Sequence, residues 1–247
     1  SDDRLVLAPR YDLVFNTEQP LIWSLAADSR GNVYLGTGHD GKIFKVDSSG
    51  KNQLVADLAE LDVMALAVDS KDVLYAGTSP DGKVYRIKPD SAPEVFFEPG
   101  AKYIWSLVFD RQGRLLVATG DKGVIYRVAA DGKSETFYDS DETNIVSLAL
   151  DKDGNVIAGG DPKGYVYRIS PEGKAFILYD SGLREVHAVA VAPNGNIYAA
   201  VLSGQANFPS APPAGGPRPA GGGDATISIT VEAAAAQSIE DRKSTRL

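Results

Sequence analysis

Hydrophobic and polar positions recur along the chain with a period of 41 residues. The first copy, within Ile22–Ala59, holds four short runs rich in apolar and β-branched residues, with Gly, Asp or Ser between them. These runs are Ile22–Ala27, Asn32–Thr37, Lys42–Val46 and Asn52–Asp57. Short runs bounded by turn residues are typical of β-strands, and no helical period is present. The pattern therefore predicts an all-β repeat of four strands.

The repeat continues without gaps, so that equivalent residues keep the same spacing. The glycines that close the hairpin before the third run illustrate this: Gly41, Gly82, Gly123 and Gly164. Four antiparallel strands in a repeat of about 40 residues form the blade of a β-propeller. We expect four complete blades plus partial blades at both ends, as in a fragment of a propeller of about 6–8 blades.

The four runs differ in composition, which predicts their places in a blade. The first run is almost continuously apolar, as expected of a strand that is buried on both faces and lines the central channel. The second run follows an Asp-x-x-Gly turn, as at Asp28 and Gly31. The fourth run is the most variable and is expected to be the outer edge strand.

Both ends of the sequence depart from the repeat. Residues 1–10 are expected to form a surface segment, and Tyr11–Asn16 matches the fourth strand of a blade whose other strands are missing. A fifth repeat begins with Val186–Val191 and Asn196–Leu202 and then loses the pattern. We therefore divide the chain into a surface segment, propeller blades over residues 11–202, and a remainder over residues 203–247.

The remainder is dominated by small residues and proline. Ser210–Gly223 is too rich in Pro, Gly and Ala to pack, so residues 203–247 are interpreted as a flexible insertion and a truncated, disordered tail. Asp241–Leu247 (DRKSTRL) resembles the translation of a sequencing adapter, which would make it no natural part of the protein.

Composition and charge exclude several classes of protein. The chain has 247 residues, a net charge of −8 and no cysteine, so neither disulfides nor cysteine-bound metals are available. Dispersed acidic residues argue against nucleic-acid binding, which requires a basic face. No apolar run approaches the length of a membrane span, so no membrane insertion is expected. The sequence starts Ser-Asp-Asp without a methionine, which fits a signal peptide that has been removed or was never included. The compartment stays open, with a preference for an extracytoplasmic one.

The repeat resembles the two-component-regulator type of propeller repeat and, more loosely, NHL and gluconolactonase-like propellers. Ile22–Thr37 with Gly41–Phe44, and their equivalent Ile104–Thr119, carry the resemblance. Gly36-Thr37 stands where NHL repeats have an aspartate, and the Gly-His and Trp-Asp pairs of WD repeats are absent. The resemblance implies the architecture, whereas activities differ widely among propellers.

Large residues at the start of the first strand are candidates for ligand contact. Trp23, Trp105 and His187 occupy the same repeat position. Exposed indoles there would form an aromatic platform for a ligand. The alternative is that the tryptophans wedge neighbouring blades together and that His187 is a core residue.

Acidic loops form the second group of candidates. His39, Asp40 and Asp81 lie between second and third strands, and Glu60 lies between a fourth and a first strand. In a propeller these two sets of loops share one face, which would then carry an acidic ring. Such a ring could hold a divalent cation. The alternative, which we favour, is that these residues serve turn geometry and are solvated.

Basic residues recur in the third strand, one in each blade. They are Lys45, Arg86, Arg127 and Arg168. We expect them to be solvated or paired.

These observations favour a binding module over an enzyme. The chain shows no Ser-His-Asp set, phosphate loop or nucleotide fingerprint, so we predict no catalytic residue, cofactor or metal. The first hypothesis is a non-enzymatic sensor or scaffold that binds a protein, peptide or glycan through Trp23, Trp105, His187 and the loops with His39, Asp40 and Asp81. A gluconolactonase-like metal-dependent hydrolase is the alternative, and a passive assembly domain is a third possibility. The first strands contain Trp, Ser and aliphatic residues instead of converging carboxylates, which disfavours the hydrolase.

Overall fold

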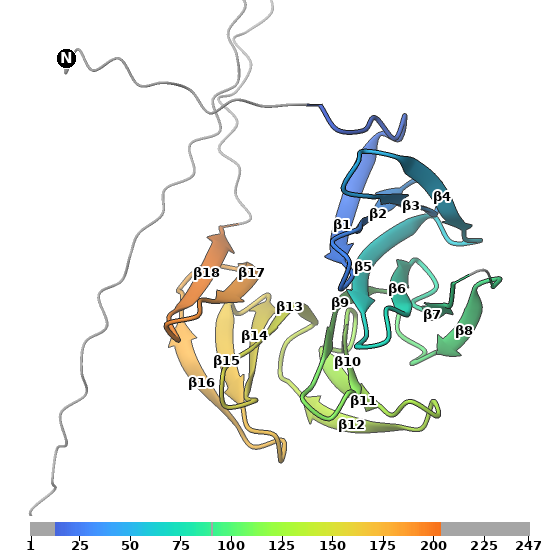
Figure 1. Cartoon of the computed structure of the whole chain (residues 1–247). Helices are drawn as coiled ribbons and strands as arrows, with labels where there is room; N and C mark the ends of the chain where they lie inside the picture. Colours follow the sequence, from blue (N-terminus) through green and yellow to red (C-terminus); the bar gives the residue numbers. More distant parts are fainter. Residues whose placement is uncertain (1–12, 90, 204–247) are drawn as a thin grey trace, which may run out of the picture. The chain divides into compact units, whose positions relative to one another are not determined.

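The computed structural model describes residues 13–89 and 91–203, and every regular element within them is a β-strand (Figure 1). Consecutive strands pair antiparallel in four sheets of four strands and one of two. We call these sheets blades one to five, with blade five formed by β17 and β18. The all-β expectation with four complete blades is confirmed.

The strand bounds follow the repeat. The first strands are β1 (Leu21–Ala27), β5 (Asp62–Val68), β9 (Ile104–Phe109), β13 (Asn144–Leu150) and β17 (Glu185–Val191). The second strands are β2 (Val33–Gly38), β6 (Leu74–Ser79), β10 (Leu115–Thr119), β14 (Val156–Asp161) and β18 (Ile197–Leu202). The third strands are β3 (Lys42–Val46), β7 (Val84–Ile87), β11 (Val124–Val128) and β15 (Tyr165–Ile169). The fourth strands are β4 (Asn52–Asp57), β8 (Glu94–Phe97), β12 (Ser134–Asp139) and β16 (Ala175–Asp180).

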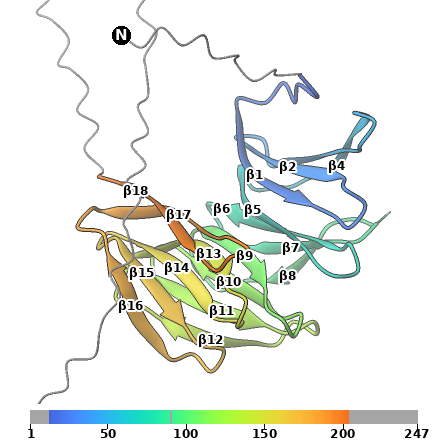
Figure 2. The ribbon, with the colours of Figure 1, turned by 60° about the vertical axis from the view of Figure 1, so that its left-hand side comes forward.

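Each blade packs on the one before it through its first strand. Strand β5 contacts β1 and β2, β9 contacts β5 and β6, and the same relation holds for β13 and β17. The first strands lie on the inner side of the row of blades and the fourth strands on the outer side, as Figures 1 and 2 show. The fourth strand is therefore the outer edge strand that the sequence predicts.

A β-branched residue at the start of each later first strand fills a space beside the second strand of the preceding blade. Val63, Ile104, Ile145 and Val186 are all fully buried. A Cβ atom added to Gly77 would lie 2.5 Å from Cγ2 of Ile104, and one added to Gly36 would lie 2.7 Å from Cγ1 of Val63. These glycines are needed because the next blade approaches closely, and not for an unusual backbone angle.

The expectation that the first strand is the one buried on both faces is wrong. Every residue of β6, β10 and β14 is buried, so the second strands form the centre of the core. The first strands are only partly buried because one of their faces lies on the inner side of the blades. In β1 exposure is greater still, since no described sheet packs on its outer face.

The expected strand at Tyr11–Asn16 is not formed by the part of it that the structure describes, residues 13–16. No third strand with which it would pair lies among the described residues. Phe15 nevertheless packs edge-on against Phe44, with ring centroids 5.4 Å apart. Phe97 and Tyr126, the equivalent pair between blades two and three, have the same separation of 5.4 Å. The contact between blades is therefore kept without the strand.

Several expectations concern residues outside the described ranges. The surface segment 1–10, the insertion and tail within 204–247 and the adapter-like Asp241–Leu247 belong to this group, and the division of the chain at residues 10 and 202 stays a prediction. None of the residues described here forms a helix that could cross a membrane.

Candidate ligand-binding face

The loops between second and third strands lie at the same end of the blades as the connections from fourth to first strands. Antiparallel order requires this, and hydrogen bonds join the two sets. The amide of His39 donates to Oδ1 of Asp62 at 3.1 Å, and the amide of Lys163 donates to Oε2 of Glu142 at 2.8 Å. We call this end of the blades the loop face.

Trp23 is held on the loop face by a residue of the next blade. Its Nε1 donates to Oδ1 of Asp62 at 3.1 Å, the same oxygen that accepts the amide of His39. The indole lies against Gly38, where an added Cβ would come within 2.4 Å of Nε1. Trp23 is nonetheless 46% exposed. The side chain is therefore fixed in direction and open to solvent, which suits a preformed contact surface.

Trp105 forms the same arrangement in blade three. Its Nε1 donates to Oδ1 of Asn144 at 3.2 Å, and the amide of Asp121 donates to that oxygen at 3.2 Å. An added Cβ at Gly120 would lie 2.3 Å from Nε1. Here, however, the indole stacks on Tyr103 with centroids 5.2 Å apart and is only partly exposed. The two tryptophans share one construction, but Trp23 is the more accessible.

Blades two and four replace every part of this arrangement. Met64 and Val146 stand for the tryptophan, Ser79 and Asp161 for the glycine, and Tyr103 and Glu185 for the acceptor. Pro80 and Pro162, each after a cis peptide bond, stand where His39 and Asp121 have positive φ angles of 71° and 67°. Blades one to four therefore alternate between two types, which is not apparent when every repeat is compared only with its neighbour.

These contacts bear on both interpretations of the tryptophans. Each indole ties its blade to the next one, as the wedge alternative requires. The exposed part of Trp23 keeps the ligand-contact hypothesis open. Its use in binding stays a prediction.

Most carboxylates of the expected acidic ring are already paired. Glu60 contacts Nζ of Lys83 at 2.6 Å, Asp161 contacts Nε of Arg184 at 2.9 Å, and Asp141 lies 3.8 Å from Nζ of Lys163. Within the described ranges no group of three or more potential ligands is placed to hold a metal ion. The ring is a set of separate ion pairs.

The carboxylate of Glu60 is buried on the loop face. Burial would raise its pKa, but hydrogen bonds from Lys83 and from the hydroxyl of Tyr85, at 2.6 Å, outweigh burial and hold the pKa below its ordinary value. Burial and the bond to Glu60 raise the pKa of Tyr85 far above its usual range. Glu60 therefore remains charged inside a hydrogen-bonded cluster.

Replacing Glu60 should alter how stability depends on pH. Because the pKa of Glu60 is lower in the folded state, its contribution is present above the ordinary pKa near 4.5 and is lost as pH falls through the folded value. We expect Glu60→Gln to lower the free energy of unfolding at pH 7 by about 1–3 kcal/mol and to flatten its decline in acid. Urea titrations between pH 3 and 7 measure both effects. Asp139→Asn, which removes an exposed carboxylate, should change neither, and an unaltered acid profile in Glu60→Gln would contradict the assignment.

The remaining predicted site residues are dispersed. Asp40 pairs with Lys42. Asp81 is exposed in the loop between β6 and β7. His187 is 61% exposed at its side chain, and its Nδ1 lies 2.7 Å from Oε1 of Glu185. Of the six candidates, the structure brings together only Trp23 and His39, through Asp62.

Three of the recurring cations of the third strands are paired, and two of these join neighbouring blades. Arg86 contacts Glu94 and donates to the carbonyl of Ala130 at 3.3 Å. Arg127 donates to the carbonyl of Pro171 at 2.7 Å. Arg168 pairs with Asp151, and Nζ of Lys45 lies 5.8 Å from the ring centre of Tyr34.

Sequence reasoning missed the acceptors of the two indoles. Asp62 and Asn144 are the first residues of β5 and β13, one position before the strands predicted from hydrophobicity. The sequence did contain a signal. In a blade with tryptophan, glycine follows the predicted second strand, and Asp or Asn stands just before the predicted first strand of the next blade. Neither residue occurs at these positions in blades two and four, which lack tryptophan.

Comparisons with known proteins agree on architecture. No protein-family model matches the chain, and no curated protein matches it. A streptogramin B lyase structure is similar with a TM-score of 0.67 at 16% identity, covering 75% of this chain and 64% of that one. The extracellular domain of a proposed one-component system from B. thetaiotaomicron is similar with a TM-score of 0.62 at 18% identity, covering 76% of this chain and 26% of that one. The chain has a β-propeller fold.

Further propellers extend this comparison. A proposed gluconolactonase matches with a TM-score of 0.56 at 15% identity, covering 72% of this chain and 70% of that one. Such low identities establish the fold alone. The propeller described here spans 64% of the length of the streptogramin B lyase chain.

Proposed function

We propose that this propeller is a non-enzymatic binding module whose loop face holds a peptide or glycan ligand against Trp23. The observation that carries the proposal is an indole fixed by Asp62 and Gly38 yet 46% exposed. A rigid aromatic surface loses little conformational entropy on binding, and its flat face suits sugar rings and peptide side chains. His39 lies beside it, with Nδ1 3.9 Å from Asp62, and supplies a polar group at the edge of the indole.

The wider ligand set of the proposal includes Trp105, Asp40, Asp81 and His187. These residues lie on the same loop face in other blades or loops, where an extended ligand or a protein surface would reach them. The similar extracellular domain of a proposed one-component system is consistent with a sensor role.

The chain contains only two tryptophans, so fluorescence reports the proposed site directly. Trp105→Phe leaves Trp23 as the sole fluorophore, and Trp23→Phe leaves Trp105. We expect a linear oligosaccharide such as cellohexaose, or a blocked aromatic tripeptide, to change Trp23 emission saturably and Trp105 emission far less. No saturable change with either class of probe, or equal changes in both variants, would contradict the proposal.

The same preparations separate the binding module from the alternative hydrolase. A metal-dependent lactonase requires a cation that polarises the lactone carbonyl. Hydrolysis of gluconolactone that depends on added Ca²⁺ or Zn²⁺ would favour the enzyme. Equal melting temperatures with and without these ions, together with probe binding at Trp23, are the result expected of the binding module.

A further inference from the structure

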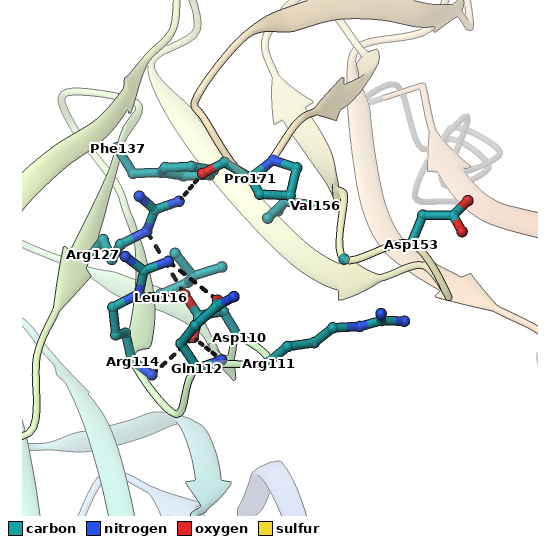
Figure 3. A pocket seen from close by; sticks show the side chains of 11 residues that line it. Asp110, Arg111, Gln112, Arg114, Leu116, Arg127, Phe137, Asp153, Val156 and Pro171 are labelled. Atoms are coloured by element: carbon teal, nitrogen blue, oxygen red, sulfur yellow. Dashed lines mark hydrogen bonds and ion pairs between the residues drawn. The ribbon is translucent and has the colours of Figure 1, made fainter.

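A second candidate site lies between blades three and four, at the end of the strands opposite the loop face (Figure 3). It is a cleft of about 190 Å³ formed by the turns that precede β10 and β14, the turn that precedes β16, and residues of β10 to β12. Its lining includes Arg111, Arg114, Arg127, Phe137, Val156 and Pro171. Asp110 and Asp153 line the cleft as well.

Arg127 forms a fixed wall of this cleft. Its guanidinium stacks on the ring of Phe137, with Cζ 4.0 Å from the centroid, and it donates to the carbonyl of Pro171 and to Glu135. Its buried Nε has no hydrogen-bond acceptor among the described residues, and the carboxylate of Asp110 is 3.8 Å away. Arg127 therefore contributes a fixed guanidinium–aromatic stack to a preformed surface, and its charge is paired with Glu135.

Arg114 forms the hydrogen bond to the turn aspartate that an asparagine forms in blades one and four. In blade four, Nδ2 of Asn155 donates to Oδ2 of Asp151 at 2.8 Å, and Asn32 and Asp28 form the same pair in blade one. In blade three, Nε of Arg114 donates to Oδ2 of Asp110 at 2.7 Å. Arg114 thereby preserves the turn. It also adds to the cleft a guanidinium group, which the fold itself does not require.

Arg111 is also specific to this blade. Ser29 and Ser70 occupy its position in blades one and two. Its stem lies beside Gly154, where an added Cβ would be 3.4 Å from its Cδ. No hydrogen bond or ion pair reaches its guanidinium from the described parts of the chain, and none is drawn to it in Figure 3. Arg111 thus offers unused donors at the mouth of the cleft.

Acidic residues offset part of this charge, because Asp110 pairs with Arg114 and Glu135 pairs with Arg127. Oδ1 of Asp110 accepts the backbone amides of Gln112 and Arg114, and its Oδ2 accepts Arg114. Asp153 lies 3.9 Å from Arg168 of its own blade. Arg111 is therefore the arginine of the cleft that has no counter-ion among the described residues, and its donors are available to an incoming anion.

We propose that this cleft binds a small organic carboxylate. The carboxylate group lies against the unpaired guanidinium of Arg111, whose planar shape matches its geometry, and Arg114 offers further donors on the other side of the cleft. The body of the ligand packs between Pro171 and Val156, beside the stacked pair of Arg127 and Phe137. The volume of the cleft suits one ring or a short branched chain.

Ligand-observed NMR with benzoate tests the proposal, with benzamide as an uncharged molecule of the same shape. We expect benzoate to show saturable binding and benzamide to bind at least about tenfold more weakly, because the charged hydrogen bonds are lost. Arg111→Ser with Arg114→Asn restores residues found in blade one and should weaken benzoate about tenfold or more. Lys152→Ser removes one positive charge at the equivalent of Arg111 in blade four and should leave the affinity unchanged.

Three results would overturn the proposal: no benzoate binding at millimolar concentration, equal binding of benzamide, or full affinity in the double variant. If the double variant does not fold, Arg111→Ser alone is tested with benzoate. The hydrogen bond of Arg114 to Asp110 remains in this variant, so the turn should be preserved. Benzoate should also leave Trp23 fluorescence unchanged, which separates this cleft from the loop face.

Discussion

Ile104→Ala is expected to lower the free energy of unfolding by about 2–5 kcal/mol. Ile104 is fully buried between blades two and three, with Cγ2 placed over Gly77. Truncation removes apolar contacts with the preceding blade. It also leaves a cavity that the two packed blades cannot close. Urea unfolding followed by circular dichroism measures the loss.

The chain provides a matched control for this substitution. Ile22 occupies the same repeat position in blade one, where no described sheet packs on it, and it is 47% exposed. Ile22→Ala should therefore cost less than about 1 kcal/mol. Similar losses at the two positions would show that contact between blades is not what stabilises the fold.

Gly38→Ala is expected to displace the indole of Trp23 without altering the tryptophan itself. The added Cβ would lie 2.4 Å from Nε1 and 3.0 Å from Oδ1 of Asp62. Because the end of the indole side chain can move while the backbone cannot, the bond between Trp23 and Asp62 should break, at a cost of about 0.5–1.5 kcal/mol. In the Trp105→Phe background, Trp23 emission should shift to longer wavelength, and probe affinity should fall about tenfold.

Two substitutions at equivalent positions control this experiment. Gly120→Ala should affect Trp105 in the same way, because the added Cβ lies 2.3 Å from its Nε1. Ser79→Ala, at the equivalent position of blade two, should change neither tryptophan. An unchanged Trp23 spectrum in Gly38→Ala would contradict the arrangement described for blade one.

The strands could be predicted because a short local pattern of apolar and turn residues defines each of them. Lys42–Val46 and Asn52–Asp57 have the bounds that the sequence indicates, since a turn with glycine or aspartate limits each one. Residues 13–16 failed as a strand because pairing depends on a partner that no local pattern reveals. Burial of the second strands was missed for a similar reason, as it arises from packing between blades.

The sequence singles out candidate residues such as Trp23, but it does not reveal which residues they contact. Trp23 was identifiable because repeats disagree at its position, whereas Asp62 became recognisable only once blade two was placed beside blade one. The cleft was missed because Arg111 and Arg114 lie in a turn whose Asp and Gly fully explain its conformation. Functional residues in such a turn can be recognised only when the equivalent turns of all blades are compared and the packing between blades is known.

The two similarly built tryptophan clusters differ in access, with Trp23 open to a ligand and Trp105 stacked on Tyr103. Acrylamide quenching of the two single-tryptophan variants measures this most directly. We predict that acrylamide quenches Trp23 distinctly more strongly than Trp105 and that a bound probe reduces quenching of Trp23. Equal quenching of the two residues, or stronger quenching of Trp105, would contradict the account.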